Sequence, residues 1–239
     1  MRYEILTLPC LADNYAYLLH DKATGSTALI DAPEAAPVLA ALKARGWSLD
    51  MVLLTHHHWD HVDGLPDILA ETSPRIVGAA KDAARLPALD LAVSEGDEVE
   101  IGGLKGRVID VSGHTVNHIA FAFEGAVFTG DSLFAMGCGR VFEGDMEMMY
   151  QSLQKLAVLP ADTMVYSGHE YTLANAKFAA AQWPDDAAIA ARLADIKRLR
   201  AAGIPTVPSL LSLELATNPF LRATDAKEFA EIRLAKDNF

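Results

Sequence analysis

Four histidines and one aspartate stand within six residues of one another in the run THHHWDH, residues 55–61. Neutral imidazole and carboxylate are the ligands expected for zinc, iron or manganese, and this run has no thiolate. A purely structural histidine does not need three companions, and a purification tag stands at a terminus without an interspersed aspartate. The run, which we call the histidine loop, therefore predicts a metal site.

The residues before the histidine loop indicate how it is held. The apolar stretch Met51–Thr55 is typical of a buried strand, so the histidines follow at its end. Because side chains alternate along an extended chain, His56 and His58 point the same way, while Asp60 and His61 turn into the next helix. One strand end thus offers four potential ligands.

Three more polar residues follow strand-like runs elsewhere in the chain. They are His114 in SGHT, Asp131 in FTGDSLF and His169 in YSGHEYT. Each lies in a glycine-containing turn, which on its own is an ordinary turn pair. Together with the histidine loop, they predict that several strand ends supply ligands to one site.

Short strand-like runs alternate with helical segments over the first two-thirds of the chain, which predicts a layered α/β domain. The strand candidates are Tyr15–Leu19, Thr27–Ile30, Met51–Thr55, Val108–Val111, Ile119–Phe123, Val127–Thr129 and Met164–Ser167; the helix candidates are Ala35–Ala44, Leu65–Glu71 and Met146–Leu159. We expect Asp145 to cap the last of these helices. These connections place polar turns at strand ends.

The pattern changes after about residue 170. Thr172–Ala202 is rich in alanine with helical spacing, is interrupted at Trp183-Pro184 and starts again at Asp185-Asp186. Asp225–Lys236 predicts a last short helix. We expect a helical tail without strands, and a boundary between a domain of residues 1–168 and a helical domain of residues 169–239.

The amino-acid composition limits the classes of partner and the cellular compartment that we expect for this protein. A chain of 239 residues with 51% hydrophobic content can bury a full core, and its net charge of -12 disfavours a nucleic-acid partner. Cys10 and Cys138 are too few and too distant for a disulfide framework, which favours a reducing compartment. Without a signal peptide or a long apolar window, we expect a cytoplasmic protein with no membrane partner. We also expect a monomer.

Along the chain, the candidate ligands form an HxHxDH motif that is followed by a single His, a single Asp and a last His. This order resembles the ligand pattern of the metallo-β-lactamase superfamily. Finer motifs are similar to those of the glyoxalase II (hydroxyacylglutathione hydrolase) family: THHHWDH, GHTVNH, FTGDSLF, GCGRVFEG, GHEYT and ATNPFLR. The resemblance extends from Asp13 to Phe239. It implies an α/β fold, the metallo-β-lactamase αββα sandwich, in the catalytic domain, followed by a small C-terminal helical domain that binds glutathione.

The resemblance also implies a role for each candidate ligand. The first metal ion would be bound by His56, His58 and His114, and the second by Asp60, His61 and His169. Asp131 would bridge the two ions. Zinc is the expected metal, and iron and manganese suit the same ligands. Asp60 and Asp131 are the candidate catalytic residues, with hydroxide from a shared metal-bound water as the nucleophile. Packing or hydrogen-bonding roles are expected for His57 and His118.

The implied reaction is hydrolysis of the thioester S-D-lactoylglutathione to D-lactate and glutathione. The implied substrate-binding residues are Arg140, Phe142, Tyr171, Arg233 and Lys236, and cations suit the two carboxylates of glutathione. Some family members have tyrosine where this chain has Phe142, which keeps the ring and loses a hydroxyl hydrogen bond.

Two other functions stay open. A persulfide dioxygenase of the same superfamily would use one iron ion and oxygen, and it has no use for a complete second site. The residues Asp60 and His169, together with Arg233 and Lys236, favour the hydrolase. A metal-binding module without catalysis would carry the same ligands and cleave no thioester.

Overall fold

The computed structural model describes residues 2–239, and the chain forms two compact units. Unit 1 comprises residues 1–110 and 117–124, and unit 2 comprises residues 111–116 and 125–239. Among the described residues, no helix combines the length and the apolar character that a membrane span requires.

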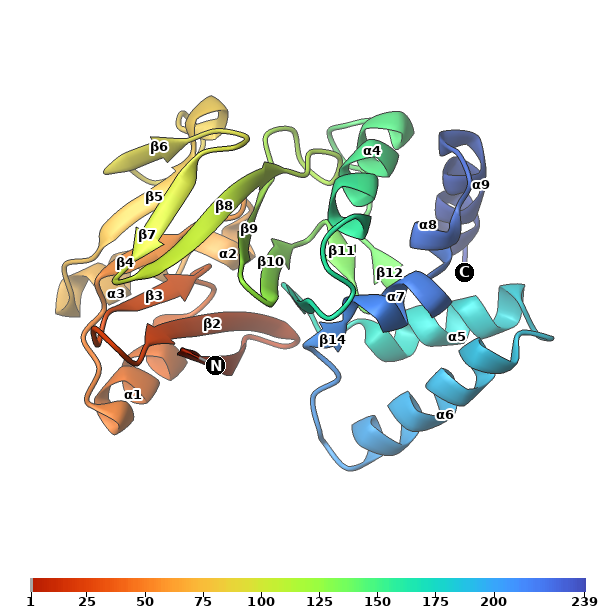
Figure 1. Ribbon diagram of the computed structural model, residues 1–239, viewed down its shortest axis with the longest axis horizontal. Helices are drawn as coiled ribbons and strands as arrows, with labels where there is room; N and C mark the ends of the chain where they lie inside the picture. Colours follow the sequence, from red (N-terminus) through yellow and green to blue (C-terminus); the bar gives the residue numbers. More distant parts are fainter. Residues whose placement is uncertain (1) are drawn as a thin grey trace. The chain divides into compact units, whose positions relative to one another are not determined.

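Unit 1 is built mainly of strands (Figure 1). Its elements are β1 (Tyr3–Cys10), β2 (Asn14–Asp21), β3 (Thr27–Ile30), α1 (Ala35–Arg45), β4 (Met51–Leu53), α2 (Trp59–Val62), α3 (Leu65–Glu71), β5 (Arg75–Ala79), the 3-10 helix η1 (Ala80–Asp82), β6 (Leu91–Val93), β7 (Glu98–Ile101), β8 (Leu104–Asp110) and β9 (Ile119–Phe123). The first six strands form one sheet in chain order, and β7, β8 and β9 pair antiparallel in sequence.

The direction of the strands in the six-stranded sheet decides where its polar loops meet. The strands β1, β2 and β3 are antiparallel, whereas β3, β4, β5 and β6 are parallel. All residues of β3 and β4 are buried, as is typical of parallel strands covered on both faces. Parallel strands end at the same edge, so the residues after β3, β4 and β5 are brought together there.

Helices α1 and α3 cover one face of this sheet. Val38 and Leu42 of α1 and Ile68 of α3 pack with Leu29 and Val52 of the strands in one apolar cluster. Each such side chain contributes about 1.5–3 kcal/mol by leaving water. Helix α1 ends at Gly46, whose positive φ of 64° closes the last turn. This core fixes the strands that carry the histidine loop.

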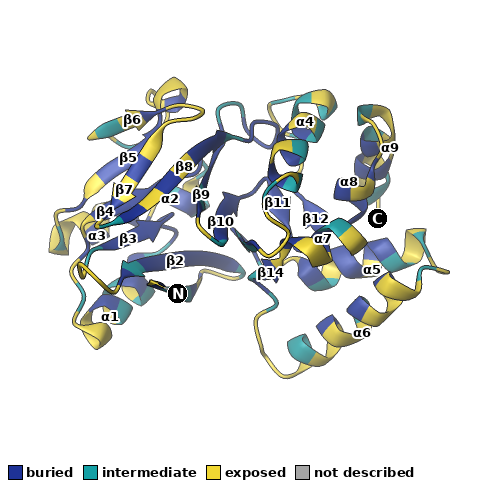
Figure 2. Cartoon of the chain, viewed as in Figure 1, coloured by how far each residue is buried: buried dark blue, intermediate teal, exposed yellow. Residues whose placement is uncertain are grey.

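Unit 2 combines a small sheet with helices. Its elements are β10 (Ala126–Gly130), β11 (Leu133–Phe134), β12 (Gly137–Cys138), α4 (Met146–Ala157), β13 (Met164–Ser167), α5 (Thr172–Gln182), α6 (Ala187–Ala201), β14 (Ser209–Leu210), α7 (Leu211–Thr217), α8 (Pro219–Arg222) and α9 (Ala226–Asp237). Strands β10 and β13 are parallel, β14 pairs antiparallel with β13, and β11 and β12 form a hairpin. Figure 2 shows that α6 exposes much of its surface.

Several predicted elements are confirmed. The Asp145 side chain accepts a hydrogen bond from the Met148 amide and caps α4, which buries Met149, Leu153 and Leu156 on one face. The predicted break near Trp183 separates α5 from α6, and the Asp186 side chain caps the new helix.

Other predictions were wrong in detail. The tail is not free of strands, because Ser209 and Leu210 pair with Val165 and Met164 of β13. A two-residue strand is too short to show an alternating pattern, which is why the sequence did not reveal it. Helix α4 ends at Ala157 rather than at residue 159, and β4 ends at Leu53 before the loop begins. Strand β1 was not predicted at all.

Candidate metal centre

The histidine loop of unit 1 gathers its side chains at the end of β4. The ring centre of His56 lies 4.7 Å from that of His58 and 4.2 Å from that of His61. Ligand atoms of His56 and His58, and of Asp60 and His61, lie within 4.8 Å of each other. The loop turns because α2 starts at Trp59, and the His61 amide donates to the His58 carbonyl. One strand end therefore presents four ligand-capable groups.

Asp31, which the sequence analysis did not single out, orients this loop. It follows β3 directly, and its carboxylate accepts hydrogen bonds of 2.8 Å from both the amide and the hydroxyl of Thr55. Its Oδ2 also lies 2.9 Å from Nδ1 of His61. A carboxylate only accepts, so Nδ1 of His61 carries the proton and the lone pair is on Nε2. The strand-end signal that marked the other ligands also precedes Asp31.

The same tautomer is set in His56. The Thr55 hydroxyl donates to Asp31, so its oxygen can accept from Nδ1 of His56 at 3.0 Å. Asn14, at the start of β2, fixes the neighbouring acid by donating to the Asp60 carbonyl and to its Oδ2, at 3.0 and 3.1 Å. Both imidazoles are thus prepared as neutral ligands with Nε2 as the donor atom.

The two histidines that were not expected to bind metal make other contacts. Nδ1 of His57 lies 3.0 Å from Oδ2 of Asp82, the last residue of η1, and Arg85 pairs with the same carboxylate. His118 is buried, and its ring stacks on His56 at 4.5 Å. Both residues therefore support the loop from its flanks.

Unit 2 carries a second cluster, made of His114, Asp131 and His169. Asp131 follows β10 and His169 follows the parallel strand β13, so both stand at one sheet edge. Oδ2 of Asp131 lies 3.2 Å from Nε2 of His169 and 3.5 Å from Nε2 of His114. Nδ1 of His114 donates to the Arg140 carbonyl at 2.8 Å, which again leaves the Nε2 lone pair for a ligand.

These spacings fit ligand atoms around a metal ion. Two atoms each about 2.0–2.2 Å from a tetrahedral ion lie about 3.3–3.6 Å apart. The separations of 3.2 and 3.5 Å in unit 2 are close to this value. The separation of 3.9 Å between Nε2 of His61 and Oδ2 of Asp60 in unit 1 is slightly longer. Both clusters therefore suit a divalent transition-metal ion.

Gly139 permits the close approach that the unit 2 cluster needs. A Cβ atom at this position would lie 2.0 Å from the Asp131 carbonyl oxygen and 3.1 Å from Nδ1 of His114. No side chain larger than hydrogen can be accommodated without moving Asp131. This is the physical reason for the second glycine of the GCGR motif.

Two aromatic residues from the predicted substrate site lie against the cluster histidines. The Tyr171 ring stacks parallel to His169 at 4.6 Å, and the Phe142 ring lies 5.2 Å from that of His114. Phe142 is 63% exposed, so most of its ring is open to a ligand. These rings form an accessible apolar border beside the unit 2 cluster.

The three predicted cations gather around Asp237, and we call them the cationic cluster. Arg233 is only 3% exposed; its Nη1 donates to the Cys138 carbonyl and its Nη2 to Asp237, at 3.0 and 2.9 Å. Arg140 is largely exposed, with its Nε 3.7 Å from Asp237. Burial, and then the charges of Arg233 and Arg140, lower the pKa of Lys236. Three cations share one carboxylate, which makes this region locally positive in an acidic protein.

Cys10 and Cys138 are both free and buried. Burial raises the pKa of each thiol to about 11, although Arg233 opposes the shift at Cys138. A thiol of such pKa is almost wholly protonated at neutral pH and is a poor nucleophile. Neither cysteine is therefore a candidate for catalysis.

Comparison with known proteins identifies the class. The metallo-beta-lactamase superfamily model matches residues 13–169, and the chain belongs to that superfamily. A solved structure, ETHE1 from Myxococcus xanthus, is 28% identical with a TM-score of 0.75, and the match covers 98% of this chain and 90% of that one. The predicted fold class is thereby confirmed.

Within the superfamily, the chain belongs to the hydroxyacylglutathione hydrolase family. The model for the hydroxyacylglutathione hydrolase C-terminus matches residues 170–239. Two curated proteins named hydroxyacylglutathione hydrolase, from Ruegeria pomeroyi and Cereibacter sphaeroides, are 59% and 56% identical, and each match covers 100% of both chains. The resemblance noted from the motifs is confirmed.

Proposed function

We propose that this protein is a metal-dependent hydrolase that cleaves S-D-lactoylglutathione, and related S-2-hydroxyacylglutathiones, to glutathione and the free hydroxy acid. The observation that carries the proposal is the full-length similarity to hydroxyacylglutathione hydrolases at 51–59% identity. The two histidine and aspartate clusters supply the chemical means for it.

We propose two divalent ions, with zinc as the expected metal. The first would be held by His56, His58 and His114, the second by Asp60, His61 and His169, with Asp131 bridging. The hydrogen bonds that set the histidine tautomers support these roles, because they leave Nε2 of His56, His61 and His114 as ligand atoms. When bound, such a pair of ions lowers the pKa of a shared water so that hydroxide is available at neutral pH.

The side chains of the chain have distinct tasks in this reaction. Asp131 lies between two imidazoles, where its charge offsets that of the cations. Asn14 holds Asp60 so that its carboxylate keeps a fixed direction and could also accept a hydrogen bond from the nucleophile. The leaving thiolate needs little help from a general acid, because a thiol is itself a fair acid.

We propose that the substrate is held by residues of unit 2. The exposed Arg140 and the partly buried Lys236 suit one carboxylate of glutathione, while Phe142 and Tyr171 lie along its apolar part. Arg233 supports this site by binding the Cys138 carbonyl and Asp237. The matched ranges 13–169 and 170–239 support a division into a catalytic domain and a helical glutathione-binding domain near residue 168.

The decisive experiment follows thioester absorbance when purified protein is mixed with S-D-lactoylglutathione. Wild type should turn over, and Asp131→Asn should lose most of kcat because the neutral amide cannot bridge two cations. The matched control is Asp195→Asn, which makes the same chemical change at an exposed position of α6. If metal-loaded wild type does not hydrolyse S-D-lactoylglutathione, the proposed function is wrong.

Metal analysis and oxygen uptake test the persulfide dioxygenase alternative. The hydrolase should contain about two ions per chain and consume no oxygen with glutathione persulfide. One iron per chain together with oxygen uptake would favour the dioxygenase. Gel filtration and cell fractionation test the expected monomer and the expected cytoplasmic location.

A further inference from the structure

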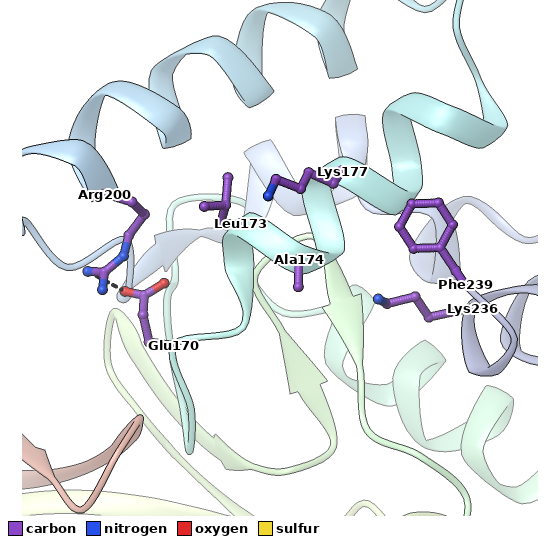
Figure 3. A pocket seen from close by; sticks show the side chains of 7 residues that line it. All are labelled: Glu170, Leu173, Ala174, Lys177, Arg200, Lys236 and Phe239. Atoms are coloured by element: carbon purple, nitrogen blue, oxygen red, sulfur yellow. Dashed lines mark ion pairs between the residues drawn. The ribbon is translucent and has the colours of Figure 1, made fainter.

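A groove runs along α5 on unit 2, apart from the side chains of the two metal clusters. Its volume is about 540 Å³, and it is lined by Glu170, Leu173, Lys177, Arg200, Lys236 and Phe239, with Ala174 on its floor. Figure 3 shows Lys236 and Phe239 at one end and the Arg200–Glu170 pair at the other, with Leu173 and Ala174 between them. Of these residues, only Lys236 had been predicted to bind substrate.

The groove is positively charged. Three cationic side chains line it against one acidic side chain, Glu170, whose carboxylate is already held. Glu170 accepts hydrogen bonds from the amide and hydroxyl of Thr206, and Nη1 of Arg200 lies 3.4 Å from it. Glu170 therefore orients Arg200 at the rim of the groove. Lys177 is exposed and has no acidic partner among residues 2–239. A ligand that enters this groove should be anionic.

The Lys236 end adjoins the cationic cluster already described. The Lys236 ammonium lies 5.5 Å from the ring centres of Phe178 and Phe239, which hold its stem beside the groove. Arg233 and Arg140 lie close enough to lower its pKa. This end can bind one carboxylate, and Arg200 at the opposite end can bind a second, while Lys177 rises from α5 between the two ends (Figure 3).

The stretch of α5 along the groove is comparable in length to a tripeptide. Helix α5 starts three residues after His169, and from residue 172 to residue 177 it rises about 7.5 Å. A three-residue chain spans about 10 Å when extended. Tyr171, which lies between His169 and α5, stacks on His169. Glu170, the residue after His169, lines the Arg200 end, so this end of the groove is adjacent in the chain to a proposed metal ligand, and each end carries a cation.

We propose that the α5 groove binds the γ-glutamyl end of the glutathione moiety, whose α-carboxylate contacts Lys177 and Arg200. The other carboxylate, that of the glycine residue, binds at the Lys236 end. The site rests on the proposed function and adds to it a second, separate subsite. It makes the γ-glutamyl group a specificity determinant of this protein.

The test removes one charge from the groove and one group from the substrate. Lys177→Met is compared with Lys197→Met, which removes the same charge from an exposed position of α6 outside the groove. Each is assayed with S-D-lactoylglutathione and with S-D-lactoyl-N-acetylcysteinylglycine, which lacks the γ-glutamyl group. Calorimetric titration with S-methylglutathione measures binding without turnover.

We expect Lys177→Met to raise KM for the glutathione thioester, and the Kd of S-methylglutathione, about three- to tenfold. The change in KM for the truncated thioester should be much smaller, and Lys197→Met should match wild type. Equal effects of the two substitutions, or an equal KM rise for both thioesters, would overturn the subsite. Wild type that binds S-methylglutathione but cleaves no thioester would instead contradict the proposed function, and the titration would still decide on the groove.

Discussion

Replacement of Asp31 by asparagine tests whether metal affinity depends on a residue that binds no metal itself. Asp31 has a positive φ of 55°, a conformation that asparagine tolerates well, so the backbone should not change. The side chains are also nearly the same size. What changes is the hydrogen bonding to Thr55 and His61.

The effect can be worked out from the three donors that face Asp31. Oδ1 accepts from the Thr55 amide, and Oδ2 faces the Thr55 hydroxyl and Nδ1 of His61. In either orientation of the asparagine amide, its NH₂ group meets at least one of these donors. Where the NH₂ group takes the Oδ2 position, His61 loses the partner that fixes its tautomer; where it takes the Oδ1 position, it faces the Thr55 amide instead. In both orientations the His61 ring loses its anionic support. Loss of such a partner typically lowers metal affinity 10–100-fold, which is about 1.4–2.7 kcal/mol.

The assay is competition for zinc between the protein and a chromophoric chelator. Asp21→Asn is the matched control, because Asp21 is equally buried in unit 1 and its carboxylate accepts from Ala23, Thr24 and Gly103 rather than from a histidine. Asp21→Asn should lower stability and leave zinc affinity within about twofold of wild type. If folded Asp31→Asn binds zinc as tightly as wild type, the argument from the His61 tautomer is refuted.

Four further outcomes are expected. Raising the ionic strength should raise KM for S-D-lactoylglutathione more than it lowers kcat, because salt screens the partly exposed cations that are proposed to bind the substrate. An unchanged KM would contradict this role of the cations. Phe142→Tyr should lower KM by restoring a hydroxyl hydrogen bond of about 0.5–1.5 kcal/mol, and steady-state kinetics with an unchanged KM would contradict this. Since burial raises the pKa of Cys10 and Cys138 to about 11, roughly one thiol in a thousand is ionised at pH 8. A thiol reagent should therefore detect both cysteines only after denaturation. Rapid labelling of the native protein would show that the pKa values are lower. Gly139→Ala should reduce bound metal, measured after dialysis, because its Cβ would displace Asp131; full metal content would show that the hairpin can move instead.

Much of the candidate site was predictable, because strand ends leave a strong signal in the sequence. An apolar run followed by a polar residue in a turn marked His56, His114, Asp131 and His169. Asp31 carries the same signal after Thr27–Ile30, yet it was missed because a single acid after a strand is common. Its role appears only when β3 and β4 are known to be parallel neighbours, which places Asp31 beside Thr55.

The helical region was less predictable, because its important contacts join residues far apart in the chain. Glu214 shows this: its carboxylate accepts from the Met136 amide and from Asn218, and it pairs with Arg192. None of these partners follows from helical periodicity. Strand β14 was missed for a related reason, since only its partner β13 defines it. Short elements and buried polar networks depend on tertiary contacts that a local pattern does not contain.

The contacts within unit 2 also argue against a strict separation between substrate recognition and the metal centre. Arg233 on α9 donates to the carbonyl of Cys138, and the next residue, Gly139, packs directly against Asp131. A buried guanidinium needs its partners, so α9 cannot shift without straining this hairpin. The helix that carries Lys236, a proposed substrate-binding residue, is thereby connected to the strand end that carries Asp131. The proposed recognition residues of α9, although far from Asp131 in sequence, are thus connected to this proposed metal ligand through a few backbone contacts.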